Sequence, residues 1–235
     1  MKVKSKLLNK LMIALGVVAL FSLTSCLDDD DDITPEQVAF VSIYHLSPDA
    51  PDLDVELDDR LIFNQALEYT DYSNYLRFYP GSRELAFSPF NANNILVDTT
   101  VNFQADKVYS VFVSGAGSNL STLIVEDKIE SPAAGESMIR VIHLSPDAAA
   151  TDFYLGDEST ALISDLEFNE SSEFEAIDAG EYDLNITPGG ETDALVSVEK
   201  ANFREGGIYT VLLRGFENAP AGNNNDLSIQ IVRNQ

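Results

Sequence analysis

The chain has 235 residues and a formal net charge of −25 at pH 7, from 14 Lys and Arg against 39 Asp and Glu. Such a surface repels polyanions, which argues against nucleic acid and anionic membrane faces as partners. Apolar residues make up 45% of the chain, enough for a core in each of two ordinary domains. The single cysteine cannot form an internal disulfide.

The first 25 residues have the pattern of an export signal. Lysines stand at the start, an apolar run extends from Leu11 to Phe21, and small residues precede Cys26. The apolar run is shorter than the roughly 20 residues that a membrane-spanning helix needs, which favours a cleaved signal over a permanent anchor. We therefore predict a lipoprotein signal peptide over residues 1–25.

The segment Leu23-Thr24-Ser25-Cys26 resembles the bacterial lipobox, in which Leu and two small residues precede Cys. The resemblance implies cleavage before Cys26 and attachment of lipid to its thiol and its new amino group. Two or three acyl chains anchor a protein stably, because each buried methylene contributes about 0.8 kcal/mol. A buried free thiol is the alternative role for Cys26.

Five consecutive aspartates, Asp28 to Asp32, follow the cysteine. Because like charges repel and extend a chain, we predict a solvated tether over residues 26–37. The acidic run also resembles the surface-export signal of lipoproteins of the Bacteroidota, which implies an outer-membrane lipoprotein that faces the cell exterior. It lacks the alternating ligands and central glycine of an EF-hand loop, so it does not indicate a calcium site.

The rest of the chain is a duplication. The stretch His45–Pro51 returns 98 residues later as His143–Ala149, and two later segments match at offsets of 99 and 100, namely 80–89 with 179–188 and 101–115 with 201–215. A polar segment that contains Pro and Gly separates the copies, as linkers do. We therefore place a first repeat at 38–126, a linker at 127–136 and a second repeat at 137–235.

Both repeats have the alternation of β-strands. Apolar residues recur with period two, as at Tyr182, Leu184 and Ile186, and β-branched and aromatic residues dominate. Turn signals interrupt these runs about every ten residues. The pattern predicts an all-β chain of two tandem antiparallel β-sandwich domains of the immunoglobulin-like type.

The repeated motif places the only two histidines of the chain at the end of an apolar strand face. Val41, Ile43 and His45 share that face because side chains alternate along a strand, and Ser-Pro-Asp then predicts a turn. We interpret the motif as structural, with each histidine bonded to backbone groups or to nearby carboxylates. The residues of this motif are His45, Ser47, Asp49, Asp54, His143, Ser145, Asp147 and Asp152.

A nucleophilic set of Ser, His and Asp is the alternative role for the motif. Ser47 and His45 lie two residues apart on one strand that leads into proline, and no sequence signal supplies an oxyanion hole. Each repeat offers one histidine and no cysteine, which argues against a metal site. We predict that the protein is not an enzyme and has no catalytic residue, metal or cofactor.

The same motif resembles the signature of the domain of unknown function 4397, a family of secreted and lipid-anchored bacterial modules that often occur in tandem. That signature runs His-x-Ser-Pro-Asp-Ala-Pro and is followed closely by Asp-Val-Tyr. The first copy departs from it at Glu56, and the second departs at Ala149 and Phe153. The resemblance covers both repeats and implies a β-sandwich, but it brings no established activity.

The two copies differ at four positions that we predict to bind a ligand. The first repeat has Tyr72, Arg77, Tyr79 and Phe90 where the second has Ser171, Ala176, Asp178 and Gly189. Extra aromatic rings and an arginine are suited to stacking against a sugar or a peptide. Alternatively, these side chains belong to the core or to a surface that the second repeat covers.

Together these features predict a non-enzymatic cell-surface lipoprotein, anchored through Cys26, that binds or adheres to an extracellular glycan or protein. One alternative is a structural or assembly component of an outer-membrane surface complex. A more distant one is a hydrolase on a sandwich scaffold, which would need His45 or His143 for turnover.

Overall fold

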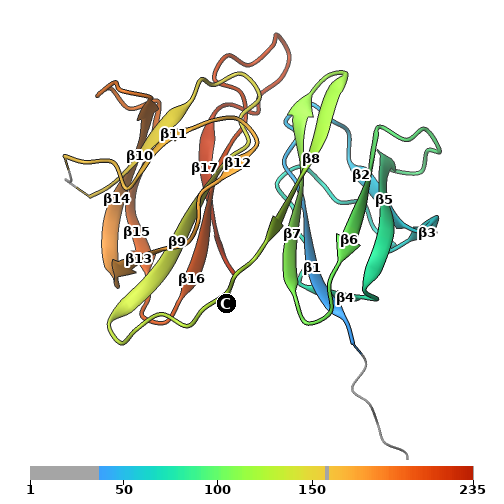
Figure 1. The fold of residues 1–235 in the computed structure, drawn as a ribbon. Helices are drawn as coiled ribbons and strands as arrows, with labels where there is room; N and C mark the ends of the chain where they lie inside the picture. The colour runs from blue at the N-terminus through green and yellow to red at the C-terminus, as the bar shows by residue number, and fades with distance from the viewer. Residues whose placement is uncertain (1–36, 157–158, 235) are drawn as a thin grey trace, which may run out of the picture. The chain divides into compact units, whose positions relative to one another are not determined.

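The computed structural model describes residues 37–156 and 159–234 (Figure 1). These residues form seventeen β-strands and no α-helix, so the prediction of an all-β fold is confirmed. None of them belongs to a helix that could span a membrane. The predicted signal peptide, Cys26 and most of the acidic tether lie outside the described residues.

The first repeat is a sandwich of two four-stranded sheets, ordered β4-β1-β7-β8 and β3-β2-β5-β6 (Figure 1). Buried apolar side chains from both sheets, such as Val41, Phe87 and Val111, fill the space between them. The strands are β1 (Ala39–His45), β2 (Leu53–Leu57), β3 (Arg60–Leu61), β4 (Leu76–Phe78), β5 (Gly81–Pro89), β6 (Val97–Phe103), β7 (Val108–Ala116) and β8 (Asn119–Glu126).

The second repeat has the same plan, with sheets ordered β12-β9-β16-β17 and β11-β10-β14-β15, and β13 also pairs with β9. Its core contains the counterparts Ile139, Ile186 and Val211. The strands are β9 (Glu136–His143), β10 (Thr151–Leu155), β11 (Ile163–Leu166), β12 (Glu170–Ser171), β13 (Glu175–Asp178), β14 (Gly180–Pro188), β15 (Val196–Phe203), β16 (Ile208–Arg214) and β17 (Ser228–Arg233).

Most strand pairs are antiparallel, as predicted, but each repeat also contains one parallel pair. β1 pairs with β7, and β9 pairs with β16. The registers correspond, because His45 lies opposite Val113 and His143 lies opposite Leu213. A parallel pair needs a long crossover connection, which the strands of the opposite sheet provide in each repeat.

A third cluster of buried apolar side chains joins the two repeats. It contains Tyr44, Leu46, Phe112, Ile142, Leu144, Leu212 and Val232. On β1, Ile43 points into the first sandwich and Tyr44 into this third cluster, so both faces of the strand are buried. The repeats are therefore packed sheet against sheet rather than separated by an extended linker.

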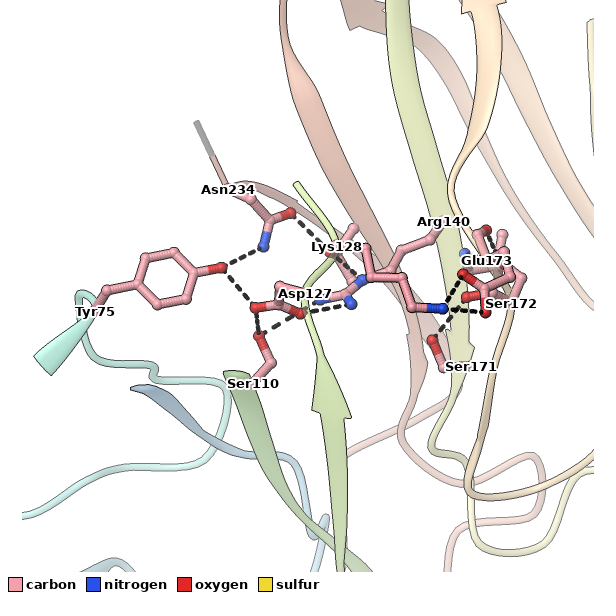
Figure 2. A network of polar contacts seen from close by, with 11 residues as sticks. Tyr75, Ser110, Asp127, Lys128, Arg140, Ser171, Ser172, Glu173 and Asn234 are labelled. Carbon is pink, nitrogen blue, oxygen red and sulfur yellow. Dashed lines mark hydrogen bonds and ion pairs between the residues drawn. The ribbon is translucent and has the colours of Figure 1, made fainter. Parts of the chain in front are cut away.

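The first linker residue, Asp127, lies inside this interface (Figure 2). Its Oδ1 pairs with Nη1 of Arg140 at 2.6 Å, and both side chains are almost fully buried. Tyr75 and Ser110 each donate a hydrogen bond of 2.8 Å to Oδ2. Burial and the negative charge of Asp127 raise the pKa of Tyr75, so its hydroxyl stays protonated and can donate this hydrogen bond.

Candidate functional site

The two histidines of the repeated motif occupy equivalent and fully buried positions. Nε2 of His45 lies 3.1 Å from the carbonyl oxygen of Pro51, and Nε2 of His143 lies 3.0 Å from that of Ala149. A carbonyl oxygen only accepts, so we assign the proton to Nε2, and Nδ1 has no partner among the described residues. Burial lowers the pKa of both histidines and keeps them neutral.

The carboxylates of Asp49 and Asp147 hold the loops that follow β7 and β16. Both oxygens of Asp49 accept the backbone amide of Gly117, at 3.1 and 3.0 Å. Asp147 accepts the amides of Glu217 and Asn218 at 2.7 and 2.8 Å. These aspartates therefore tie the motif to the neighbouring strand connection rather than to a histidine.

The carboxylates of Asp54 and Asp152 hold the loops that follow β5 and β14. Asp54 accepts the amide of Asn91 at 2.8 Å, and Asp152 accepts that of Gly190 at 2.9 Å. Asp152 also accepts the amide of Asp165 at 2.8 Å. Carboxylates that satisfy loop amides stabilise those loops, and this role is common to the two copies.

The serines of the motif are buried and are not placed as nucleophiles. Oγ of Ser47 donates to the carbonyl of Gly115 at 2.8 Å, and Oγ of Ser145 lies 3.4 Å from Asp147. Gly115 has φ +84°, and a Cβ there would overlap the carbonyl of Asn119. Within the described residues neither serine bonds a histidine, which is the contact a Ser-His pair needs for catalysis.

The structure separates the four side chains predicted to form one ligand platform. Tyr79 and Phe90 lie just beyond opposite ends of β5, which places their backbones at least about 25 Å apart. Tyr72 stacks on Tyr44 with ring centroids 5.2 Å apart, at the edge of the interface between the repeats. Arg77 lies in the short edge strand β4. One small ligand cannot contact all four residues.

A hollow of about 340 Å³ lies beside Tyr79, and we call it the Tyr79 hollow. This volume is at the lower end of the range of roughly 300–1,000 Å³ for small-molecule pockets. Tyr79 is 62% exposed. The hollow is lined by Leu57, Asp58, Arg60, Tyr79 and Arg83.

The guanidinium of Arg83 is fixed by three hydrogen bonds. It donates through Nε to the Tyr79 carbonyl at 3.0 Å, through Nη2 to the Pro80 carbonyl at 3.3 Å and through Nη1 to Asp58 at 3.0 Å. The backbone amide of Glu84, and then Arg83, lower the pKa of Asp58, which therefore stays charged. Two of the five N–H groups of Arg83 have no acceptor among the described residues.

The second repeat has an equivalent hollow of about 370 Å³ with different chemistry. Its lining includes Asp178 and Tyr182, the counterparts of Tyr79 and Arg83. The hydroxyl of Tyr182 donates to the Asp178 carbonyl at 2.9 Å. The backbone carbonyl at this position therefore accepts a hydrogen bond in both copies, from a charged guanidinium in the first and from a neutral hydroxyl in the second.

Comparison with protein families assigns the chain. The model described as "Domain of unknown function (DUF4397)" matches residues 39–154 and 137–234. The chain belongs to the DUF4397 family. The predicted tandem arrangement of this domain is confirmed.

Other comparisons add little to the DUF4397 assignment. No curated protein matches the chain. One solved structure, titled "Alpha-glucan binding by a streptococcal virulence factor", is 10% identical with a TM-score of 0.25, over 81% of this chain and 95% of that chain.

Tyr79 was predicted from the sequence, but the residues that surround it in this DUF4397 repeat were not. Arg83 aligns with Tyr182 inside the matched segments, so the same comparison of copies contained the signal. Arg60 has no such signal, because it lies in a hairpin whose counterpart differs in length. The ion pair of Arg140 with Asp127 was also missed, although a charged residue in the apolar run of β9 is unusual.

Proposed function

We propose that this DUF4397 protein is a non-enzymatic binding module at the cell surface, and that the first repeat carries the ligand site. The Tyr79 hollow is the main structural support for this proposal. It combines an exposed aromatic ring with a guanidinium that three hydrogen bonds hold in place. A fixed polar group beside an exposed ring is pre-organised, so little conformational entropy is lost when a ligand binds.

The state of the motif residues supports binding rather than catalysis. A general base must reach the proton that it removes, but the rings of His45 and His143 are fully buried and bond backbone carbonyls. The hydroxyl of Ser47 donates a hydrogen bond to the carbonyl oxygen of Gly115. These groups already serve the fold, and the Tyr79 hollow offers no nucleophile paired with a base.

We place the protein in the outer membrane, facing the cell exterior, with lipid on Cys26. The lipobox and the acidic run after it support this location. A Cys26→Ala variant should leave the membrane fraction, because the acyl chains supply the membrane affinity. External protease should digest the wild-type protein on intact cells, and digestion only after lysis would contradict the surface location.

A ligand screen tests the binding function. Residues 27–235, which contain the whole described unit, would be applied to arrays of glycans and extracellular proteins. We expect at least one ligand whose capture is lost in a Tyr79→Asp variant, which introduces the residue of the second copy. Phe90→Ala removes an exposed ring at the other end of β5 and should bind as the wild type does. Capture that does not depend on Tyr79 would contradict the proposed site.

The distribution of exposed apolar side chains favours a second function, assembly into a surface complex. Among the described residues, all the large exposed ones belong to the first repeat, namely Phe40, Leu61, Tyr72, Tyr79, Phe90 and Ile95. Exposed apolar groups of this kind can mark contacts with other proteins. In that case the soluble protein would bind no external ligand, and the lipidated protein would co-purify with envelope proteins.

A further inference from the structure

The Tyr79 hollow gathers positive charge in a strongly acidic chain. The chain has 14 Lys and Arg against 39 Asp and Glu, yet Arg60 and Arg83 line one small hollow. The single acid in the lining, Asp58, is already engaged by Arg83 and by the amide of Glu84. A ligand would therefore meet Arg60 and the two remaining N–H groups of Arg83.

One structural contact of Arg83 does not require its charge. Of its three hydrogen bonds within the fold, the one to the Tyr79 carbonyl has a counterpart in the second repeat, where Tyr182 donates to the Asp178 carbonyl without any charge. The second repeat keeps the same strand arrangement around this position. The guanidinium of the first repeat also pairs with Asp58, whose counterpart in the second repeat is Gly156, and two of its N–H groups have no acceptor among the described residues.

The chemistry of the lining points to a carboxylate attached to a ring. Guanidinium groups pair with carboxylates through parallel N–H bonds, and such charge-assisted bonds are among the strongest in proteins. The exposed ring of Tyr79 offers a flat apolar face to the body of the same ligand. A sugar that bears a carboxylate has both features in one residue.

A peptide suits this place less well. Extended peptides commonly add to the open edge of a sheet, where backbone groups supply the affinity. The edge strands beside the hollow, β3 and β4, have only two and three residues. They offer few backbone groups for pairing, which favours a glycan over a peptide strand.

We infer that the Tyr79 hollow binds the carboxylate-bearing sugar units of an acidic glycan. The inference rests on the proposed function, because it names the ligand class of the same site. Arg60 and Arg83 bind the carboxylate, and Tyr79 stacks against the sugar ring. The second repeat, with Asp178 and Tyr182 at the matching positions, does not bind this ligand.

Calorimetric titration of residues 27–235 tests the ligand class. The probes are tetragalacturonate and oligomers of mannuronate and hyaluronan, each beside its methyl ester, with maltotetraose as a neutral sugar. We expect at least one acidic probe to bind, and its ester to bind at least tenfold more weakly. Binding of the acid should weaken as NaCl is raised from 50 to 500 mM, because salt screens exposed charges.

Two variants test whether the affinity depends on the Tyr79 hollow or on the overall charge of the protein. Arg83→Tyr introduces the residue of the second copy, so the bond to the Tyr79 carbonyl can persist while the charge is lost. We expect at least a tenfold loss of affinity for the acidic probe and an unchanged unfolding midpoint. Lys128→Gln removes one positive charge from an exposed pair with Glu173 and should leave the affinity unchanged. An equal loss in both variants would overturn the inference.

The remaining outcomes distinguish this inference from the proposed function. Equal affinity for an acid and its ester would overturn the acidic-glycan inference but leave a Tyr79-dependent binding site. Capture of only a protein or peptide through Tyr79 would do the same. If no probe and no array ligand depends on Tyr79, both the ligand class and the site in the first repeat are wrong.

Discussion

The two repeats share a framework and differ in the groups that they present. In both, a buried histidine bonds a carbonyl six residues further along the chain, and two aspartates hold neighbouring loops. Two of their differences lie at the interface between the repeats and at the hollow near the β4–β5 connection. The motif residues shared by both copies maintain the fold of each repeat, and the residues that differ form the interface and, in our proposal, the ligand site.

The interface shows this contrast most clearly. By strand register, Arg140 in the second repeat corresponds to Ser42 in the first, and Asp127 in the first corresponds to Asn234 in the second. The ion pair therefore exists in only one of the two equivalent places. Arg140 also lies over the ring of Phe174, with its guanidinium carbon 4.7 Å from the centroid. The two copies thus contribute opposite charges to this interface.

Removal of the arginine should have the largest effect. Arg140→Ala leaves the carboxylate of Asp127 buried without its counter-charge, so we expect a loss of about 3–5 kcal/mol in the free energy of unfolding. Urea denaturation measures this loss. The double variant Asp127→Asn with Arg140→Ser introduces the residues of the opposite copies and should be more stable than Arg140→Ala alone. A loss below about 1 kcal/mol for Arg140→Ala would contradict a structural role for the pair.

The histidines should matter equally in the two repeats. His45→Ala and His143→Ala each remove a buried ring and leave a carbonyl without its donor, which should cost about 2–4 kcal/mol. Denaturation of each variant measures this cost. Costs that differ by more than about 2 kcal/mol would show that the motif has different roles in the two copies.

Mild acid should destabilise the protein through these same histidines. Because burial lowers their pKa in the folded state, the unfolded chain binds more protons below about pH 6.5. The free energy of unfolding is thus highest above that pH. It should fall between pH 7 and 5 by at most about 1.4 kcal/mol per pH unit for each histidine.

A double variant, His45→Gln with His143→Gln, tests the origin of this pH dependence. Glutamine keeps an N–H donor but does not titrate, so the slope of stability against pH between 7 and 5 should become flatter. The slope comes from urea denaturation at several pH values. An unchanged slope would assign the acid sensitivity to other groups.

The smallest stability effect should come from the proposed site. Tyr79 is 62% exposed, so Tyr79→Asp should change the free energy of unfolding by about 0.5 kcal/mol or less. Its neighbour Phe78 is buried in the first core, and Phe78→Ala should cost about 3–5 kcal/mol. Thermal or urea denaturation compares the two variants. A large loss for Tyr79→Asp would indicate that this ring serves the fold.

The duplication made much of the fold predictable. Alternation along the strands and the repeated motif indicated two β-sandwiches, and His45 does lie at the buried end of β1. The third core was not predictable in the same way. Tyr44 and Phe112 occupy the strand faces that alternation assigns to solvent, and only packing of one repeat on the other buries them.

The candidate site was only partly predictable, because an alignment of the two repeats does not show which residues lie close together in the fold. Tyr79 and Phe90 both distinguish the first copy, but the whole of β5 separates them. Tyr72 contributes to the edge of the interface through its contact with Tyr44. Arg83 completes the hollow only because the backbone at Pro80 turns back toward it, a geometry that residue types alone do not reveal.

The most direct test replaces Tyr79 and Arg83 in the hollow of the first repeat with the residues of the second repeat. The double variant Tyr79→Asp with Arg83→Tyr should bind none of the ligands that the wild type captures on the arrays. Its free energy of unfolding should stay within about 1 kcal/mol of the wild-type value, because both residues lie outside the cores. Unchanged ligand affinity in a folded double variant would contradict the claim that the first repeat binds through the Tyr79 hollow.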